Sequence, residues 1–319
     1  MSRLATAFTP AALGPMTLKN RFIKTATYEG MDIERCPSRC LVRHHRELAA
    51  GGVGMTTVAY GAVSPDGRTF KDQMWLRPDA VPSLRALTSA VHDAGAKCSI
   101  QLVHCGGFSK NKELERRRPM GPSAGINVYG LMSGMAFVDA MREADIQSVV
   151  EDFGRAAEVA RDAGFDAVEV HLGHGYLLSQ FLSPASNRRK DAYGGDIHGR
   201  MAFPLAVCGR VLDVVGEKLA VLVKLNISDG FKGGLTIEDA AVAAQLLEAA
   251  GVHAAVLTGG FVSRAPFYLM RGGRPLREMM AVEPSWLQKI ALGLFGPVIV
   301  KRYPFEELFF LTQARQIRA

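Results

Sequence analysis

The sequence has few cysteines and no long apolar run. Its 319 residues include five cysteines, and no two of them form a C-x-x-C pair. An odd number with this spacing argues against a disulfide framework, a zinc site and a cysteine-ligated iron–sulfur cluster. No run of about 18 apolar residues occurs, so we expect no membrane-spanning helix. Residues 1–14 lack the apolar core of a signal peptide. We therefore expect a cytoplasmic protein.

Charge is also sparse. Charged residues make up 22% of the chain, and the formal net charge is +7. The densest basic run, Arg116–Arg118, has no aromatic residues interleaved with it, so nucleic-acid binding is not expected. A phosphate-bearing cofactor or substrate would fit the sign of the charge, and so would no partner at all. The hydrophobic fraction of 48% is enough for a sizeable core.

Short apolar runs alternate with segments of helical periodicity. The short runs, which are typical of buried parallel strands, lie at 21–26, 53–60, 96–103, 167–170, 220–225 and 254–257. Helices are predicted at 38–50, 79–94, 143–163, 198–215 and 237–250. This βα repeat predicts an α/β fold, a TIM-type (β/α)8 barrel. An open doubly wound sheet is the alternative, but no strand is followed by G-x-G-x-x-G.

The last part of the sequence offers too few strands to close a barrel. Eight are needed, and residues 296–300 form the one candidate for a seventh, followed by a helix at 305–318. No candidate for an eighth remains. We therefore expect a single barrel domain over residues 1–319, C-terminally incomplete and lacking its last one or two strands. Its open sheet edges would invite pairing or aggregation.

Polar side chains gather directly after the fourth predicted strand. His171, His174 and Tyr176 fall within six residues of one another, just after the run 167–170. In a βα-repeat protein the carboxyl ends of the strands carry the chemistry. One such residue alone would more often be a turn-capping imidazole or a packed tyrosine with a wet hydroxyl. Three at one strand end favour an active site.

A longer string of residues surrounds this cluster. It reads HLGHGYLLSQFLSP at 171–184 with the first histidine at 171, and continues with Asn187, Arg189, Asp191, Tyr193-Gly194-Gly195 and Arg200. Shorter motifs at two other strand ends are Gln101-Leu102-x-His104 and Lys224-Leu225-Asn226. Over nearly the whole chain these motifs resemble the Old Yellow Enzyme family of FMN-dependent NAD(P)H oxidoreductases.

The resemblance implies catalytic roles for three residues. FMN is expected to lie across the carboxyl ends of the strands. His171 and His174 match the pair that holds the carbonyl oxygen of an α,β-unsaturated substrate, and two donors there stabilise developing negative charge as an oxyanion hole does. Tyr176 matches the proton donor to the α-carbon. A phenol, with a reference pKa of about 10, is protonated at neutral pH and can act as a general acid.

The resemblance also implies which residues hold the flavin. Gln101 suits the pyrimidine edge, because its amide both donates and accepts hydrogen bonds. Lys224 stands where many members carry arginine, near flavin N1 and O2, where a cation stabilises the anionic reduced flavin. Thr25, Ala26 and Thr27 are expected to contact the ring largely through backbone groups. Tyr60 is expected beside the ring, although core packing explains it equally well. Tyr28 stands where some members have a redox-tuning cysteine.

The sequence departs from the family at the cofactor phosphate. In the family, loops after strands seven and eight grip the phosphate with a Gly-Gly turn and a later Gly-Arg pair. Nothing after residue 300 matches either element, and neither Gly259-Gly260 nor Gly272-Gly273 is a convincing replacement. We therefore predict that this chain binds FMN weakly.

The leading functional hypothesis is an FMN-dependent reductase of small enone-type molecules with NAD(P)H as reductant. A hypothesis of a different class is a truncated, catalytically inactive family member that acts as a fragment or a binding partner.

Two weaker alternatives are a barrel aldolase with Lys224 as a Schiff-base amine and a metal site built from Glu169, His171 and His174; we expect no metal. A homo-oligomer fits the resemblance, because members often self-associate. The sequence names neither the substrate nor the choice between NADH and NADPH.

Overall fold

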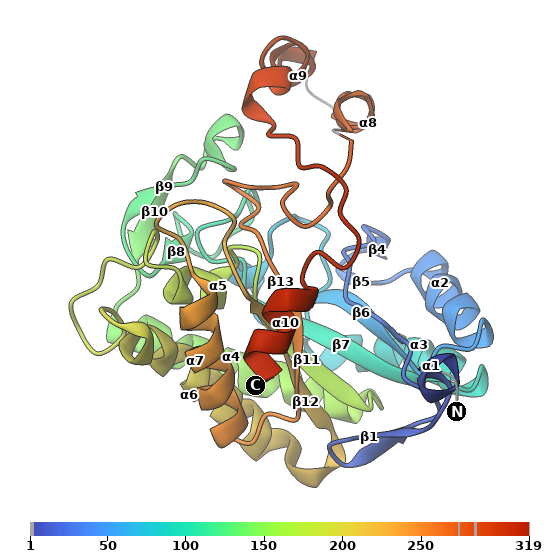
Figure 1. Cartoon of the computed structure of the whole chain (residues 1–319). Coiled ribbons are helices and arrows are strands. Elements are labelled where there is room, and N and C mark those ends of the chain that lie inside the picture. The colour runs from blue at the N-terminus through green and yellow to red at the C-terminus, as the bar shows by residue number, and fades with distance from the viewer. Residues whose placement is uncertain (1–2, 274, 284–285, 319) are drawn as a thin grey trace.

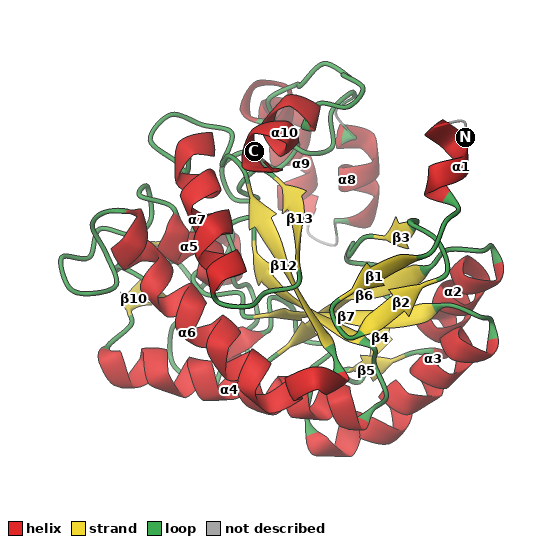
Figure 2. Cartoon of the chain, turned by 60° about the horizontal axis from the view of Figure 1, so that its bottom comes forward, coloured by secondary structure: helices red, strands yellow, loops and turns green. Residues whose placement is uncertain are grey.

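The central feature of the computed structural model is a sheet of six parallel strands (Figure 1). The structure describes residues 3–318 except 274, 284 and 285. In spatial order the strands are β13 (Ala254–Thr258), β12 (Ala220–Asn226), β11 (Ala167–Leu172), β7 (Lys97–Val103), β6 (Met55–Ala62) and β3 (Ile23–Lys24). Strands that follow one another in this series are neighbours, and every pair is parallel. This is the connectivity of a (β/α) barrel, and the sheet curls into an open arc (Figure 2).

Five long helices cover the outer face of this sheet (Figure 2). They are α2 (Arg39–Ala50), α3 (Val81–Asp93), α4 (Glu143–Asp162), α6 (Ile197–Val215) and α7 (Ile237–Ala249). Each confirms a predicted helix to within two residues at either end. The start of α2 shows why the prediction works: the Ser38 side chain accepts a hydrogen bond from the backbone N–H of Leu41 and so caps the helix.

Short elements fill the connections. They are α1 (Arg3–Ala7), the hairpin of β1 (Ala11–Leu13) and β2 (Met16–Leu18), the pair β4 (Asp32–Ile33) and β5 (Cys36–Pro37), the three-stranded sheet of β8 (Met120–Gly121), β9 (Gly125–Ile126) and β10 (Phe137–Ala140), and α5 (Leu177–Leu182). Single 3₁₀ turns lie at Pro65–Gly67, Pro78–Ala80, Leu131–Ser133 and Gly216–Lys218. None of these short pieces has enough residues to show a period in the sequence.

The C-terminal part differs from the expectation. It forms α8 (Leu276–Val282), α9 (Trp286–Ile299) and α10 (Leu311–Arg318). The predicted seventh strand at 296–300 is wrong, because residues 296–299 are the last turn of α9. The mostly apolar segment that starts at Trp286 is long enough for a helix, whereas an added five-residue strand is stable only when a neighbouring strand pairs with it. The predicted helix at 305–318 forms only as α10, which lies beside α7 (Figure 1).

The described part of the chain therefore contains six barrel strands, with β13 and β3 at the two edges of the sheet. The predicted barrel type is confirmed, and the expectation of a single incomplete domain stays a prediction. Among the described residues no helix is long and apolar enough to cross a bilayer.

Candidate active site

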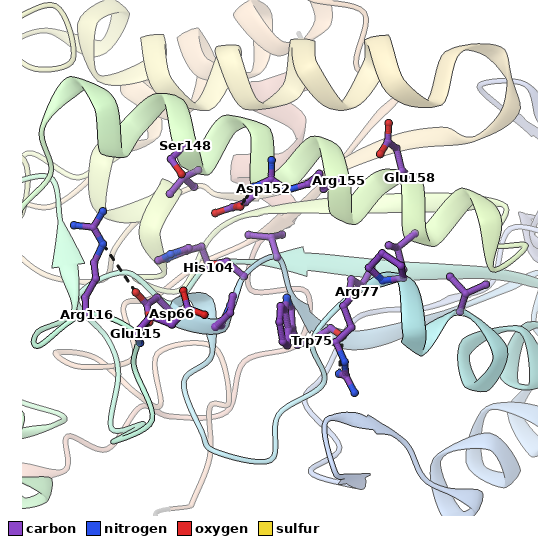
Figure 3. A pocket seen from close by; sticks show the side chains of 18 of the residues that line it. Asp66, Trp75, Arg77, His104, Glu115, Arg116, Ser148, Asp152, Arg155 and Glu158 are labelled. Atoms are coloured by element: carbon purple, nitrogen blue, oxygen red, sulfur yellow. Dashed lines mark hydrogen bonds and ion pairs between the residues drawn. The ribbon is translucent and has the colours of Figure 1, made fainter.

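A cavity of about 1010 Å³ lies outside the sheet, between α3 and α4 (Figure 3). Some of its charged side chains pair with one another, as Arg116 does with Asp145 at 2.6 Å. His104 lines it, and burial lowers the pKa of this imidazole to about 4. None of His171, His174 and Tyr176 lines this cavity. We therefore place the candidate active site at the carboxyl ends of the strands, where barrel enzymes carry their chemistry.

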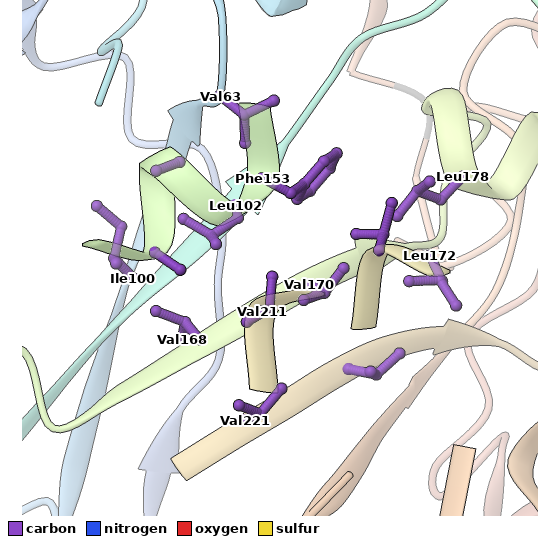
Figure 4. Packing of buried hydrophobic residues seen from close by; sticks show 14 of the residues in the cluster. Val63, Ile100, Leu102, Phe153, Val168, Val170, Leu172, Leu178, Val211 and Val221 are labelled. Carbon is purple, nitrogen blue, oxygen red and sulfur yellow. The ribbon is translucent and has the colours of Figure 1, made fainter. Parts of the chain in front are cut away.

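Alternation along each strand separates the core from the site. Val168, Val170 and Leu172 of β11 point outward and pack with Leu102 and Val211, as Figure 4 shows. The intervening residues of β11 point to the inner face of the curled sheet. At its amino-terminal end this inner face is apolar, because Leu18, Met55, Ala167, Ala220 and Leu222 pack together there. Toward the carboxyl ends it becomes polar.

The first polar group on this inner face joins three neighbouring strands. The Gln101 side-chain amide donates to Glu169 Oε1 at 2.6 Å, and Lys224 Nζ lies 3.3 Å from the same oxygen. All three side chains are buried. Burial raises the pKa of Glu169, and the nearby Lys224 ammonium opposes that shift. The sequence indicated Gln101 and Lys224 but not that Glu169 joins them. An ammonium engaged with a carboxylate is a poor nucleophile, which disfavours the aldolase alternative.

Lys224 also connects this group to the first strand. Its ammonium donates to the backbone oxygen of Ala26 at 3.4 Å. Of the three residues expected to contact the flavin there, Ala26 is half-buried, whereas Thr25 and Thr27 are exposed. The structure thus brings the Ala26 backbone to the site, and the roles of the two threonines stay predictions.

The two histidines follow at the end of β11. Their ring centroids are 5.1 Å apart, and the ring planes are nearly perpendicular at 88°. The backbone N–H of Gly173 donates to His171 Nδ1 at 3.2 Å, so the proton of the neutral ring is on Nε2. Burial lowers the pKa of His171 well below its ordinary value and that of His174 to about 4. Both imidazoles are therefore neutral at pH 7.

His174 is held by residues from two other strands. Its backbone N–H donates to Asn226 Oδ1 at 3.1 Å, and its Nε2 lies 2.7 Å from Thr258 Oγ1. Its φ of 61° is in the left-handed region, and Gly175 next to it has a φ of 81°. The sequence indicated only that Asn226 and Thr258 lie near the ends of strands. That position does not predict their contacts with His174.

Tyr176 lies against His171, with ring centroids 4.8 Å apart. Its hydroxyl donates to the hydroxyl of Tyr60 at 3.0 Å. Both tyrosines are buried, and burial raises the pKa of each well above the ordinary value. The structure thus brings together all three predicted catalytic residues. It places Tyr60 in contact with the predicted proton donor, a contact that the sequence did not indicate.

Among the described residues no three acidic, histidine or cysteine side chains are arranged to hold a metal ion.

Comparisons with known proteins identify the family of this chain. Residues 6–263 match the model of the NADH:flavin oxidoreductase / NADH oxidase family. The chain is 44% identical over 314 residues to a 4,4'-dithiodibutanoate disulfide reductase of Rhodococcus erythropolis, covering 98% of this chain and 76% of that protein. The chain belongs to the NADH:flavin oxidoreductase / NADH oxidase family. The resemblance to Old Yellow Enzyme is thereby confirmed, and FMN and NAD(P)H are the cofactors of this family.

Other relatives in the family are longer or more distant. A metal reductase of Desulforamulus reducens is 34% identical over 254 residues, which cover 80% of this chain but only 37% of that protein. A solved old yellow enzyme homologue of Zymomonas mobilis superposes with a TM-score of 0.69 at 22% identity, over 98% of this chain and 93% of that one. At 22% identity, the similarity to the Zymomonas mobilis structure supports the barrel fold alone.

The site residues fit the ring of FMN better than its phosphate. A buried amide, an ammonium and a backbone carbonyl, from Gln101, Lys224 and Ala26, supply the donors and acceptors that a flavin pyrimidine edge requires. The Gly259-Gly260 turn is crowded instead of open. A Cβ on Gly259 would lie 3.0 Å from both the Tyr268 and Phe310 rings. This turn therefore offers no cradle for a phosphate.

Proposed function

We propose that this chain is a flavin-dependent reductase that uses NAD(P)H to reduce activated C=C bonds of α,β-unsaturated carbonyl compounds. One observation supports the proposal above all: two neutral imidazoles and a protonated phenol converge at the end of β11, next to the buried Gln101–Glu169–Lys224 group. This combination offers hydrogen bonds to a carbonyl oxygen and a proton for carbon.

Bound FMN supplies the hydride that reaches the β-carbon. His171 offers Nε2–H to the substrate carbonyl oxygen, because its Nδ1 accepts from the backbone. His174 offers Nδ1–H when the Thr258 hydroxyl donates to Nε2, and the 2.7 Å contact allows that direction. Two neutral donors stabilise the enolate-like charge without transferring a proton to oxygen. Lys224 supplies positive charge next to the position expected for the pyrimidine edge.

Tyr176 delivers a proton to the α-carbon. At rest its hydroxyl donates to Tyr60. Once Tyr176 has lost its proton, the Tyr60 hydroxyl can turn and donate to the phenolate oxygen. The pKa of Tyr176 reflects this balance, because burial raises it and the hydrogen bond to Tyr60 lowers it. Tyr60 therefore makes the proton easier to release.

An organic disulfide is a second candidate substrate. The observation that favours it is the 44% identity to the Rhodococcus erythropolis disulfide reductase. Both reactions need a reduced flavin, and the two differ in the need for Tyr176 as an acid at carbon. The inactive alternative predicts no NAD(P)H-dependent chemistry with either substrate.

The test compares the wild-type chain with Tyr176→Phe, both supplied with FMN under anaerobic conditions. We expect Tyr176→Phe to slow 2-cyclohexenone reduction by roughly 10²-fold, the lower range of general-acid effects, and to leave flavin bleaching by NAD(P)H unchanged. Tyr193→Phe is the matched control, since the Tyr193 hydroxyl bonds Glu143 away from the site. Equal rates of 2-cyclohexenone reduction by Tyr176→Phe and wild type would contradict the proposal. If neither NADH nor NADPH bleached the flavin of the wild-type chain, the inactive alternative would be supported.

A further inference from the structure

Aromatic side chains connect the candidate catalytic tyrosine to a single lysine along two routes. On one route Tyr176 bonds Tyr60, which stacks on Tyr28 with centroids 4.8 Å apart, and Tyr28 stacks on Phe70 at 5.4 Å. On the other route Tyr176 meets Phe108 edge-on at 5.6 Å, and Phe108 stacks on Tyr129 at 4.1 Å. We call these six residues the aromatic circle.

Lys110 closes the circle opposite Tyr176. Its ammonium lies 5.3 Å from the centroid of the Phe70 ring and 5.0 Å from that of Tyr129. Its backbone N–H donates to the carbonyl oxygen of Thr69 at 3.2 Å, which ties the two loops of the circle together. Cation–π contact with two rings fixes the ammonium in place without neutralising it.

Lys110 differs from two other lysines near the site. Lys224 pairs with Glu169, and Lys24 pairs with Glu29. Within the described part of the chain, no carboxylate forms an ion pair with Lys110. The side chain is half-buried, and the residues at the Tyr176 end of the circle are buried, whereas Tyr28, Phe70 and Tyr129 are partly exposed. The carboxylates of Asp32 and Glu283 add to the raised pKa values of Tyr28 and Tyr129, but neither forms an ion pair with Lys110. Its positioned ammonium can therefore bind an anionic ligand group.

From this geometry we infer that the substrate carries a carboxylate remote from its reacting double bond, and that Lys110 binds it. The inference rests on the proposed function and names the class of its substrate. The apolar middle of such a molecule lies among the aromatic rings, its carbonyl oxygen meets His171 and His174, and its carboxylate accepts a hydrogen bond from Lys110. An aromatic lining with one charged group at its end recognises amphipathic acids in preference to neutral enones of the same shape.

A matched pair of ligands tests this: 4-carboxybenzylideneacetone and its methyl ester, which share a skeleton and differ in one charge. Binding is measured by calorimetry on the purified chain with FMN present, without reductant, so that no turnover is needed. We expect the acid to bind about tenfold more tightly than the ester, the effect of one charge-assisted hydrogen bond. Lys110→Met should remove this preference by weakening the acid alone, and Lys110→Arg should restore most of it.

Lys112→Met is the matched control, because Lys112 is an exposed lysine of the same loop; it should leave the preference intact. Equal binding of acid and ester by the wild-type chain overturns the inference. Equal weakening of both ligands in Lys110→Met also overturns it and makes Lys110 a structural residue. Loss of NADH binding with unchanged acid binding overturns it too, since Lys110 would then serve the cofactor phosphates.

Turnover is a separate measurement. Reduction of the ester by wild type and by Lys110→Met tests the proposed function, because the ester does not need the cation. An acid preference that depends on Lys110 together with no reduction of either ligand would leave the binding inference standing and reject the reductase.

Discussion

Tyr60 is the residue whose role the structure changes most. A strand-end tyrosine was expected beside the flavin or in the core. In the structure Tyr60 is buried, accepts the Tyr176 hydrogen bond and stacks on Tyr28, and its place beside the flavin stays a prediction. Tyr60→Phe keeps the stacking ring and removes the hydroxyl. We expect slower 2-cyclohexenone reduction with unchanged flavin reduction by NAD(P)H, because the Tyr176 phenolate loses its donor. The free energy of unfolding should fall by about 1 kcal/mol for the lost hydrogen bond.

The control for Tyr60 is a double-mutant cycle with Tyr176→Phe. If Tyr60 acts through Tyr176, adding Tyr60→Phe to Tyr176→Phe has no further effect on the rate. An additive loss would mean that Tyr60 contacts the substrate or the cofactor directly.

His45 offers a pH prediction away from the site. Its Nδ1 lies 2.8 Å from Thr56 Oγ1, and burial lowers its pKa to about 3. In the unfolded chain His45 takes up a proton near pH 6.5, whereas in the folded chain it does so only near pH 3. The free energy of unfolding therefore falls as the pH drops from 6.5 towards 3. Burial raises the pKa of Asp32 to about 7, which acts in the opposite direction. The contribution of His45 is therefore measured as a difference between two proteins.

The variant is His45→Gln, whose amide can still bond Thr56. Between pH 6.5 and 5 the wild-type free energy of unfolding should fall by roughly 1–2 kcal/mol more than that of the variant. Urea unfolding followed by circular dichroism gives both values. Parallel pH profiles for the two proteins would show that the pKa of His45 is the same in the folded and unfolded chains.

At the scale of residues, the sequence could indicate His171, His174 and Tyr176 because two imidazoles and a phenol closely follow one strand that is recognisable from its pattern. It could not indicate that Asn226 and Thr258 hold His174, since pairing across strands depends on register. Lys110 was also missed. A lone lysine in a long loop has no sequence signal, and its value comes from rings that are distant in the chain.

Among the elements, the turn between β11 and α5 sets the position of His174. A Cβ on Gly175 would lie 2.5 Å from the Phe261 ring, and Val262 donates its backbone N–H to the His174 carbonyl oxygen at 2.9 Å. Gly175→Ala should therefore push Phe261 away and disturb His174. Gly195→Ala is the matched control, because Gly195 has a similar φ of 78° but nothing within 4 Å of its Cβ position.

Both alanines carry the backbone cost of a left-handed residue, roughly 1–2 kcal/mol. Gly175→Ala should cost roughly 1–3 kcal/mol more, because it also overpacks the turn. Urea unfolding of the two variants measures this difference. Equal destabilisation would show that the loop after β13 moves freely away from the turn.

The elements that were predicted well are those with many periods of pattern. The apolar stripe of α4 and the caps of α2 define long helices from local signals alone. Strands β8, β9 and β10, between β7 and α4, are two to four residues long. They form only because they pair with one another. The seventh strand was wrong for a related reason: a short apolar run is compatible with a helix or a strand until its neighbours are known.

In the whole molecule, the fold divides the expected cofactor site into two parts. The polar groups on the inner face of the curled sheet fit a flavin ring. They lie on or directly after β3, β7, β11 and β12, and the βα repeat predicted all four strands. The sequence also indicated that the usual phosphate loops lack a match, and the crowded Gly259-Gly260 turn agrees with that.

This division predicts how the chain distinguishes FMN from riboflavin, which lacks only the phosphate. If the described residues hold the ring alone, the two flavins should bind with dissociation constants within about threefold of each other, a difference below about 1 kcal/mol. A bound phosphate with several charge-assisted hydrogen bonds would instead favour FMN by orders of magnitude. Fluorescence titration of the purified chain with each flavin measures the ratio. Lys224→Met is the accompanying variant and should weaken both flavins equally, because Lys224 is expected at the pyrimidine end, which the two flavins share. A strong preference for FMN would contradict the prediction and show that the phosphate is held in a way that these residues do not reveal.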